Sequence, residues 1–382
     1  GDGNRPKRSA HPCPRPCERQ HTVGGVIEDE EDLLLVSPET FKSRYAIDVH
    51  THHEVMEIDR KGQRIRVHDH VNDSTRWEAY DDLLIATGAR AFAPPIPGLD
   101  HPGVFSLRTV PDTRHVREWI DSRKATRAVV IGGGFIGLET AENLHLRGIE
   151  VHVVEAQDQV LPPIDIPLAA QVESHLDEHG VHLHLSTMVQ SIDLLEGGVL
   201  RVVGSGGLSL DTDLVIVAVG VRPRSSLAAD AGLDIGSYGG ILVDEFMRTS
   251  DPHIWSAGDV IETTNTITGE PIYMPLAGPA NRQGRLAADS IMGRGRPFRG
   301  VQGTVVCGLF DLTVASTGLS RKHLEAQNTI EWDTVWLRPK NHVGYYPGAQ
   351  FVHLEVNYAI HDGRILGAQA VGGAGTARRI DV

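Results

Sequence analysis

The middle of the chain alternates between short apolar runs and one longer segment of helical length. Residues 129–131 are all β-branched and predict a buried strand, and residues 151–154 predict a second one. Between them, Phe135–Leu146 predicts a helix, which Arg147 and Gly148 end with a basic last turn and a stop signal. A strand, a helix and a second strand in this order predict a βαβ unit.

Two further patterns predict antiparallel sheet. Residues 190–194 and 199–203 alternate between apolar and polar positions on either side of a glycine-rich turn, which is typical of a β-meander. Near the end of the sequence, residues 351–360 and 364–371 flank the turn sequence His-Asp-Gly, which predicts a β-hairpin. The C-terminal part is therefore predicted to be an α+β domain with an antiparallel sheet.

Three glycines follow the first predicted strand with the spacing Gly-x-Gly-x-x-Gly. Gly132 permits a tight turn, Gly134 allows the backbone to approach a pyrophosphate, and Gly137 lets the helix pack close to the strand. The free N–H groups and the positive dipole end at the start of the helix favour the same phosphates. Strand, glycines, helix and strand in register predict a dinucleotide site, against the alternative of a glycine-rich turn that binds no ligand.

Glu155 follows the second strand and indicates which dinucleotide binds. It lies 155 − 137 = 18 positions after the last glycine of the motif, close to the ~20 expected for the acid that binds the adenosine ribose. A carboxylate there accepts a hydrogen bond from the 2′-hydroxyl and repels a 2′-phosphate. No arginine follows in the next three positions, so the sequence favours NADH, and NADPH is the alternative cofactor.

The composition argues against several classes of function. The chain has 382 residues, enough for two or three domains, and a net charge of 36 − 50 = −14. No basic stripe interleaved with aromatic residues is present, so nucleic-acid binding is not expected. No apolar run reaches the ~18 residues of a membrane span. For this reason we do not expect contact with a membrane. Three cysteines do not make a disulfide framework, so we expect a protein of the reducing cytoplasm.

Two segments outside the βαβ unit resemble motifs of a known family. An apolar run ends in Ala-Thr-Gly at Thr87 and Gly88, and a later apolar run ends in Gly-Asp at Gly258 and Asp259. Both are similar to segments of the pyridine nucleotide–disulfide oxidoreductases, flavoproteins with two dinucleotide-binding domains. In that family both segments belong to the FAD domain, the Asp contacts the ribityl and pyrophosphate region of the flavin, and the NAD domain is inserted between them.

The resemblance implies a domain organisation for the whole chain. It implies an α/β fold with two Rossmann-like dinucleotide-binding domains, the NAD domain inserted in the FAD domain, and a C-terminal α+β dimerisation domain. On this scheme residues 23–110 and 240–298 form the FAD-binding domain, 111–239 the NAD(P)-binding domain and 300–382 the dimerisation domain. We expect a homodimer built mainly by the last of these, and a fragment that stops within it.

A narrower resemblance assigns roles to single residues. Residues 276–285 and 341–348 are similar to the branch that contains coenzyme A-disulfide reductases and NADH oxidases or peroxidases. In that branch Phe135 would gate the nicotinamide pocket, Glu139 would lie near the reactive edge of the flavin, and Tyr345 would face the redox cysteine of the partner subunit. Without the resemblance, the sequence favours a core position for Phe135, a solvated helix face for Glu139 and a hairpin end for Tyr345. Further cofactor contacts and substrate contacts are assigned on the same basis to Ile136, Gly220, Ala277, Asn281 and Arg282.

Residues 1–22 depart from the family. The glycine-rich FAD motif expected before Val23 is missing, so this stretch is predicted to be an unrelated leader or the product of a reading-frame error. Cys17 keeps one family feature, because it lies 24 − 17 = 7 positions before Gly24, as the redox cysteine does. Its neighbours do not match and no predicted helix supports a reactive thiolate, so its role as the redox cysteine stays open. We expect the chain as given to bind NAD(H) with little or no FAD.

The histidines and one further cysteine carry weaker signals. Three histidines cluster at residues 50–53, and His182 and His184 alternate on one predicted strand. Neither group sits with a cysteine or a carboxylate set at zinc spacing, so the sequence favours solvated strand faces and no metal. Cys307, in a strand-like run, is expected to be a buried small apolar residue.

Together these observations predict a FAD-dependent, NADH-preferring oxidoreductase of the coenzyme A-disulfide reductase type. Hydride would pass from NADH to the flavin, and electrons would then pass to a cysteine that forms a mixed disulfide with the thiol substrate. An NADH oxidase or peroxidase is the alternative, with a cysteine sulfenic acid that meets peroxide or oxygen. A non-catalytic fragment that binds only NAD(H) is an alternative of another class.

Overall fold

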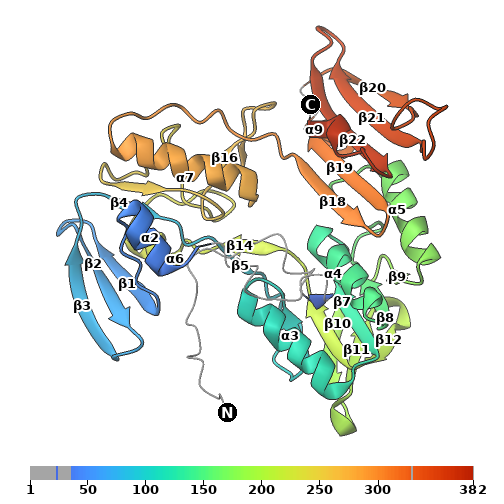
Figure 1. Ribbon diagram of the computed structural model, residues 1–382, viewed down its shortest axis with the longest axis horizontal. Helices are drawn as coiled ribbons and strands as arrows, with labels where there is room; N and C mark the ends of the chain where they lie inside the picture. The colour runs from blue at the N-terminus through green and yellow to red at the C-terminus, as the bar shows by residue number, and fades with distance from the viewer. Residues whose placement is uncertain (1–22, 25–35, 328–329, 382) are drawn as a thin grey trace.

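A computed structural model describes residues 23–24, 36–327 and 330–381, which form three lobes (Figure 1). The first lobe combines an N-terminal segment with the helix α7 (Ala277–Ile291), the middle lobe contains a parallel sheet, and the C-terminal lobe contains an antiparallel sheet. The predictions for Cys17 and for the rest of residues 1–22 concern positions outside the described residues.

The middle lobe is built on a five-stranded parallel sheet in the order β6-β13-β7-β8-β9. Its strands are β6 (Val104–Ser106), β7 (Arg127–Ile131), β8 (Glu150–Val154), β9 (His182–His184) and β13 (Leu214–Val217). Its helices are α3 (Val110–Arg123), α4 (Phe135–Leu146) and α5 (Ile166–Glu178). The predicted strand–helix–strand unit is therefore confirmed as β7, α4 and β8, and the helix has the predicted bounds.

A separate three-stranded antiparallel sheet completes the middle lobe. It consists of β10 (Val189–Leu194), β11 (Leu200–Gly204) and β12 (Ser209–Thr212), and it confirms the predicted β-meander. Apolar side chains of this sheet, such as Ile192 and Leu200, pack against the parallel sheet around Val129 and Val154. Their burial keeps one face of the parallel sheet dry.

The first lobe pairs strands that are far apart in the sequence. A meander of β1 (His53–Asp59), β2 (Arg64–Asp69) and β3 (Ser74–Ala79) lies beside the parallel pair of β4 (Leu83–Ile85) and β15 (Ile254–Ser256). Short elements complete the lobe: α2 (Pro38–Tyr45), α6 (Ser226–Asp230), β16 (Thr263–Thr264) and β17 (Pro271–Ile272). The long helix α7 (Ala277–Ile291) packs in the core of the same lobe. The later part of the chain therefore returns to the lobe that contains β1 to β4.

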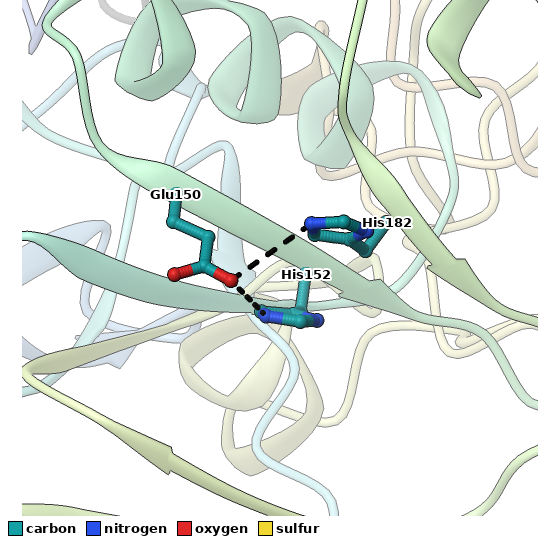
Figure 2. A group of neighbouring side chains, drawn as sticks. All are labelled: Glu150, His152 and His182. Atoms are coloured by element: carbon teal, nitrogen blue, oxygen red, sulfur yellow. Dashed lines mark ion pairs between the residues drawn. The ribbon is translucent and has the colours of Figure 1, made fainter.

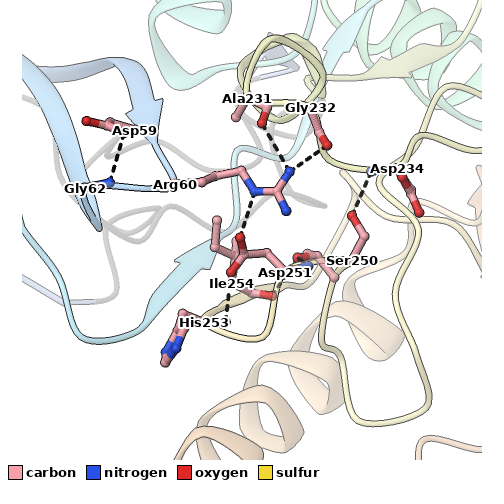
Figure 3. Close-up of polar contacts among 11 residues, drawn as sticks. Asp59, Arg60, Gly62, Ala231, Gly232, Asp234, Ser250, Asp251, His253 and Ile254 are labelled. Atoms are coloured by element: carbon pink, nitrogen blue, oxygen red, sulfur yellow. Dashed lines mark hydrogen bonds and ion pairs between the residues drawn. The ribbon is translucent and has the colours of Figure 1, made fainter.

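One arginine connects these distant segments of the first lobe (Figure 3). The Nε group of Arg60, in the turn after β1, donates to the carboxylate of Asp251 at 2.7 Å. Its Nη1 group donates to the carbonyl of Gly232 at 2.8 Å, just beyond the end of α6. Charge-assisted hydrogen bonds of this kind are about twice as strong as neutral ones, so Arg60 fixes the meander against the returning chain.

A short antiparallel ribbon carries the chain between the first and middle lobes. It pairs β5 (Ala89–Ala91) with β14 (Val221–Pro223). The points at which the chain changes lobe differ from the predicted limits of 111 and 239, because β6 already belongs to the parallel sheet. In addition, α6 packs in the core of the first lobe with Ile58 and Ile254.

The C-terminal lobe is a five-stranded antiparallel sheet in the order β18-β19-β22-β21-β20. Its elements are β18 (Val305–Leu309), β19 (Leu312–Gly318), α8 (Arg321–Gln327), β20 (Trp332–Leu337), β21 (Val352–Ala359), β22 (Ile365–Gly372) and α9 (Arg378–Asp381). The predicted hairpin is confirmed as β21 and β22. This lobe packs on α4 and α5 of the middle lobe, and the two lobes share one apolar core.

No helix within the described ranges is both long enough and apolar enough to cross a membrane.

Candidate functional site

The loop between β7 and α4 shows why each motif position holds glycine. Gly132 has φ +108°, and a Cβ there would lie 2.6 Å from the carbonyl oxygen of Ala218. A Cβ on Gly137 would lie 1.9 Å from the carbonyl oxygen of Gly132, so only glycine lets α4 approach the strand this closely. A Cβ on Gly134 would meet no protein atom within 4 Å. Gly134 therefore borders open space, where a pyrophosphate has room to approach the backbone.

The start of α4 is suited to bind that phosphate group. Gly134 is the N-cap of the helix, and among the described residues no side chain caps the N–H groups of the first turn. These N–H groups carry the positive end of the helix dipole. Phe135 and Ile136, in the same turn, are half-buried. The described residues therefore fit a dinucleotide: they provide space, hydrogen-bond donors and partial positive charge at one point.

Glu155 is held at the edge of this loop. Its Oε2 atom accepts a hydrogen bond from the backbone N–H of Gly133 at 2.6 Å, and its Oε1 atom accepts one from the N–H of Gln157 at 2.8 Å. The residue is only 8% exposed. Two backbone donors stabilise the ionised carboxylate, so a fixed negative charge lies beside the glycine loop. Its contact with a ribose stays a prediction.

Glu139 lies on α4, against the C-terminal lobe. Burial raises the pKa of its carboxyl to about 7, while a hydrogen bond with the Cys307 thiol acts in the opposite direction. Burial likewise raises the pKa of Cys307 far above its usual range, and the Glu139 charge adds to this effect. Cys307 is 1% exposed and forms no disulfide, which confirms the prediction of a buried small residue. A carboxyl with a pKa near 7 can both accept and release a proton at neutral pH.

The first lobe brings the two predicted FAD segments together at the ends of β4 and β15. Gly88 and Gly258 have φ angles of +67° and +84°, a conformation that favours glycine. The hydroxyl of Thr87 donates to the carbonyl of Arg224 at 2.8 Å, and Asp259 carries a half-buried carboxylate. In an open sheet of parallel strands, ligands bind beyond the carboxyl ends of the strands, which is where these residues lie.

Three residues around Asp259 were not found by sequence reasoning. The guanidinium of Arg108 contacts the Asp259 carboxylate at 2.7 Å, and the hydroxyl of Tyr273 donates to the Asp259 carbonyl at 3.0 Å. The side chain of Gln283, on α7, accepts the N–H of Gly258 at 2.9 Å. Burial and the Asp259 charge raise the pKa of Tyr273 to about 12. These side chains fix the Gly-Asp segment. Arg108 and Tyr273 lie outside the motifs that the sequence displays, whereas Gln283 lies within residues 276–285 but was given no role there.

The remaining predicted residues lie on α7, before the ribbon between the lobes, and in a loop of the C-terminal lobe. Ala277 begins α7, and Asn281 and Arg282 are exposed on the same helix. Gly220, with φ +101°, precedes the ribbon between the lobes, and its carbonyl accepts the N–H of Phe92. Tyr345 is 90% exposed in the loop between β20 and β21. In this structure the Tyr345 side chain therefore lies on the surface.

Comparisons with known proteins agree with this geometry. The family model described as pyridine nucleotide-disulphide oxidoreductase matches residues 9–284. An NADH oxidase of Methanocaldococcus jannaschii is 36% identical over 96% of this chain and 81% of its own length. A coenzyme A disulfide reductase of Staphylococcus haemolyticus is 31% identical over the same two shares. The crystal structure of reduced CoADR-RHD from Bacillus anthracis superposes with a TM-score of 0.95 and 41% identity, covering 98% of this chain and 67% of that one. The chain belongs to the family of pyridine nucleotide-disulphide oxidoreductases.

Proposed function

We propose that this chain passes electrons from NADH, through FAD, to the disulfide of a small thiol compound of the coenzyme A class. The proposal rests mainly on the complete dinucleotide loop at residues 132–137, with Glu155 held beside it. It is supported by relatives that include a coenzyme A disulfide reductase. Bound FAD supplies the redox chemistry, since a flavin accepts hydride from a nicotinamide and passes two electrons onward.

The chain's own residues supply binding and proton positions for this reaction. The first turn of α4 binds the pyrophosphate of NADH, and Glu155 accepts from the ribose hydroxyl. Thr87, Gly88 and Asp259 hold the flavin at the ends of β4 and β15. Glu139, with a carboxyl pKa near 7, holds a proton on the helix that carries the nicotinamide site.

A comparison of electron acceptors tests the proposal. The chain is supplied with FAD and NADH, first without oxygen in the presence of coenzyme A disulfide, and then in air or with hydrogen peroxide and no disulfide. We expect NADH consumption in the first condition, with two thiols released for each NADH. NADH consumption that needs oxygen or peroxide, with no thiol released, would contradict the disulfide assignment.

The second candidate function is an NADH oxidase or peroxidase. It is favoured by the 36% identity with the NADH oxidase of M. jannaschii. The two candidates share the NADH-binding half of the reaction and differ only in the acceptor, so the comparison of acceptors separates them. NADH binding without turnover on any acceptor would instead support the third reading, a non-catalytic chain that binds NAD(H).

The proposal includes a homodimer in the cytoplasm. Several large apolar side chains of the C-terminal lobe are exposed, and exposed apolar groups favour protein–protein contact. Trp336 and Leu337 on β20 are 46% and 48% exposed, Phe351 is 48% exposed, and Tyr345 is 90% exposed. In the dimer, Tyr345 of one subunit would reach the flavin of the other. The small number of cysteines supports a reducing compartment.

A further inference from the structure

Four polar side chains gather where β8 and β9 lie side by side at the edge of the parallel sheet. Glu150 and His152 are two residues apart on β8, and His182 and His184 are two residues apart on β9. Residues two apart on a strand point to the same face. The register of the two parallel strands pairs His152 with His182, so the topology gathers donor atoms from both strands in one place.

Three of these side chains direct donor atoms at one point (Figure 2). The Oε1 atom of Glu150 lies 3.4 Å from Nε2 of His152 and 3.8 Å from Nε2 of His182. One donor atom from each of the three residues lies within 4.8 Å of the others. Tetrahedral ligands on bonds of ~2.0–2.1 Å are about 3.3 Å apart. The cluster is therefore close to the spacing that a single metal ion requires.

His184 fixes the orientation of one of the two imidazoles. Its Nε2 atom lies 3.0 Å from Nδ1 of His152, so the two rings share a hydrogen bond on the side away from Glu150. Histidines that bind metals commonly have their second ring nitrogen held by such a partner.

We propose that Glu150, His152 and His182 bind one divalent ion of the Zn²⁺ class, with His184 as a positioning residue and water as a further ligand. Two imidazoles and one carboxylate suit zinc and its neighbours in the first transition series, whereas Mg²⁺ and Ca²⁺ prefer oxygen alone. The rings of His152 and His182 stack 24° from parallel, so the His182 ring would turn about its Cβ–Cγ bond to meet the ion, while His184 holds the His152 ring. The side chains of Glu150 and His182 are each 51% exposed, which leaves room for that rotation.

The site is separate from the proposed NADH site. Glu150 is the first residue of β8, while Glu155 follows its last residue, so the two sites lie at opposite ends of the strand. A neighbouring cation opposes metal binding, because Arg127 on β7 pairs in register with Glu150. We therefore expect Arg127→Gln to tighten metal binding.

A second histidine group provides a matched control. His175 lies in the last turn of α5 and His179 is the residue that caps its end, and their donor atoms lie within 4.8 Å of one another and of an Asp311 carboxylate oxygen. Here Nε2 of His175 already contacts Asp311 at 3.0 Å, and the ring of His179 stacks on Phe310 with centroids 4.0 Å apart. Stacking restrains the His179 ring, so this group is expected to bind zinc more weakly.

The test is a zinc titration of the full chain, without an affinity tag and after removal of metals by a chelator. Zn²⁺ is titrated in competition with a coloured chelator. We expect one tightly bound Zn²⁺ per chain, which millimolar Mg²⁺ does not displace. His182→Asn and Glu150→Gln should each weaken binding at least tenfold, and His184→Asn should weaken it by about 10- to 100-fold. His179→Asn should leave the affinity of this ion unchanged.

Two further readouts distinguish binding from misfolding. The melting temperature of the metal-free chain should be the same for His182→Asn as for the wild type, while added Zn²⁺ should raise it only for the wild type. Co²⁺, used as a coloured substitute, should give a visible spectrum that changes in His182→Asn. Full zinc affinity in His182→Asn, or loss of the ion in His179→Asn, would overturn the proposal. Displacement of the ion by Mg²⁺ would also overturn it.

Discussion

Alanine substitutions at two glycines of the dinucleotide motif should have different effects. Gly137→Ala should lower the stability of the protein, whereas Gly134→Ala should weaken NADH binding. At Gly137 a new Cβ would lie 1.9 Å from the carbonyl oxygen of Gly132 and 3.1 Å from its carbonyl carbon. Both atoms belong to the backbone, so α4 would have to move. Overpacking of this kind costs about 1–3 kcal/mol. We therefore expect Gly137→Ala to lower the melting temperature by several degrees.

At Gly134 the same methyl group would meet no protein atom within 4 Å. The backbone there has φ −78° and ψ −179°, which alanine adopts without strain. We expect the stability of Gly134→Ala to stay within ~0.5 kcal/mol of the wild type. The methyl group would fill the space predicted for the pyrophosphate. Loss of one charge-assisted hydrogen bond, worth ~1.5–3 kcal/mol, would weaken NADH binding by about 10- to 100-fold.

Thermal melting without ligand and NADH titration of the same samples provide the assay. The reasoning requires Gly134→Ala to melt like the wild type and to bind NADH poorly. If Gly134→Ala bound NADH as tightly as the wild type, the loop would not be the pyrophosphate site. If it melted as low as Gly137→Ala, the open space described at Gly134 would be wrong.

Three further predictions concern cofactor preference, the pH dependence of stability and assembly. The wild type should bind NADH at least tenfold more tightly than NADPH, a difference of about 1.4 kcal/mol. Glu155→Arg should shift this preference toward NADPH. Equal dissociation constants of the wild type for the two nucleotides would refute the role of Glu155 in ribose binding. Burial, and then the charge of Asp165, raise the pKa of Glu355 above its usual 4.5. The protonated Glu355 carboxyl therefore contributes fully to the stability of the folded state below pH 4.5, and this contribution is lost as the pH rises through the raised pKa. The melting temperature of Glu355→Gln should therefore rise relative to that of the wild type as the pH increases from 5 to 8. If the melting temperatures of the two proteins changed with pH in parallel, the raised pKa of Glu355 would be refuted. Deletion of the chain from Gly300 onward should give monomers in sedimentation analysis, and a shortened chain that stays dimeric would place the interface elsewhere.

The sequence predicted those parts of the fold that depend on local patterns. β7, α4 and β8 follow from a β-branched run, three spaced glycines and a helical segment, all within 30 consecutive positions. The hairpin of β21 and β22 follows from alternation on either side of a turn. In each case the residues that determine the element are neighbours in the chain, so their periodicity shows in the sequence.

The parts that the sequence did not predict depend on contacts between distant segments. The ion pair between Arg108 and Asp259 joins residues 151 positions apart, and no motif marks Arg108 as its partner. Likewise, Glu150 meets His182 only because β9 lies beside β8 in the sheet. Sequence reasoning considered the histidines without this carboxylate and favoured no metal. Strand order, which local patterns do not encode, is what brings these groups together.

The central claim is that the middle lobe delivers electrons from NADH to a flavin. The most direct measurement is the flavin absorbance near ~450 nm during an oxygen-free NADH titration, with the chain supplied with excess FAD so that weak FAD binding does not decide the outcome. We predict that the chain accelerates bleaching of the flavin, that the rate saturates with NADH, and that Gly134→Ala slows it at low NADH. Bleaching no faster than in a mixture of NADH and free FAD would contradict the account.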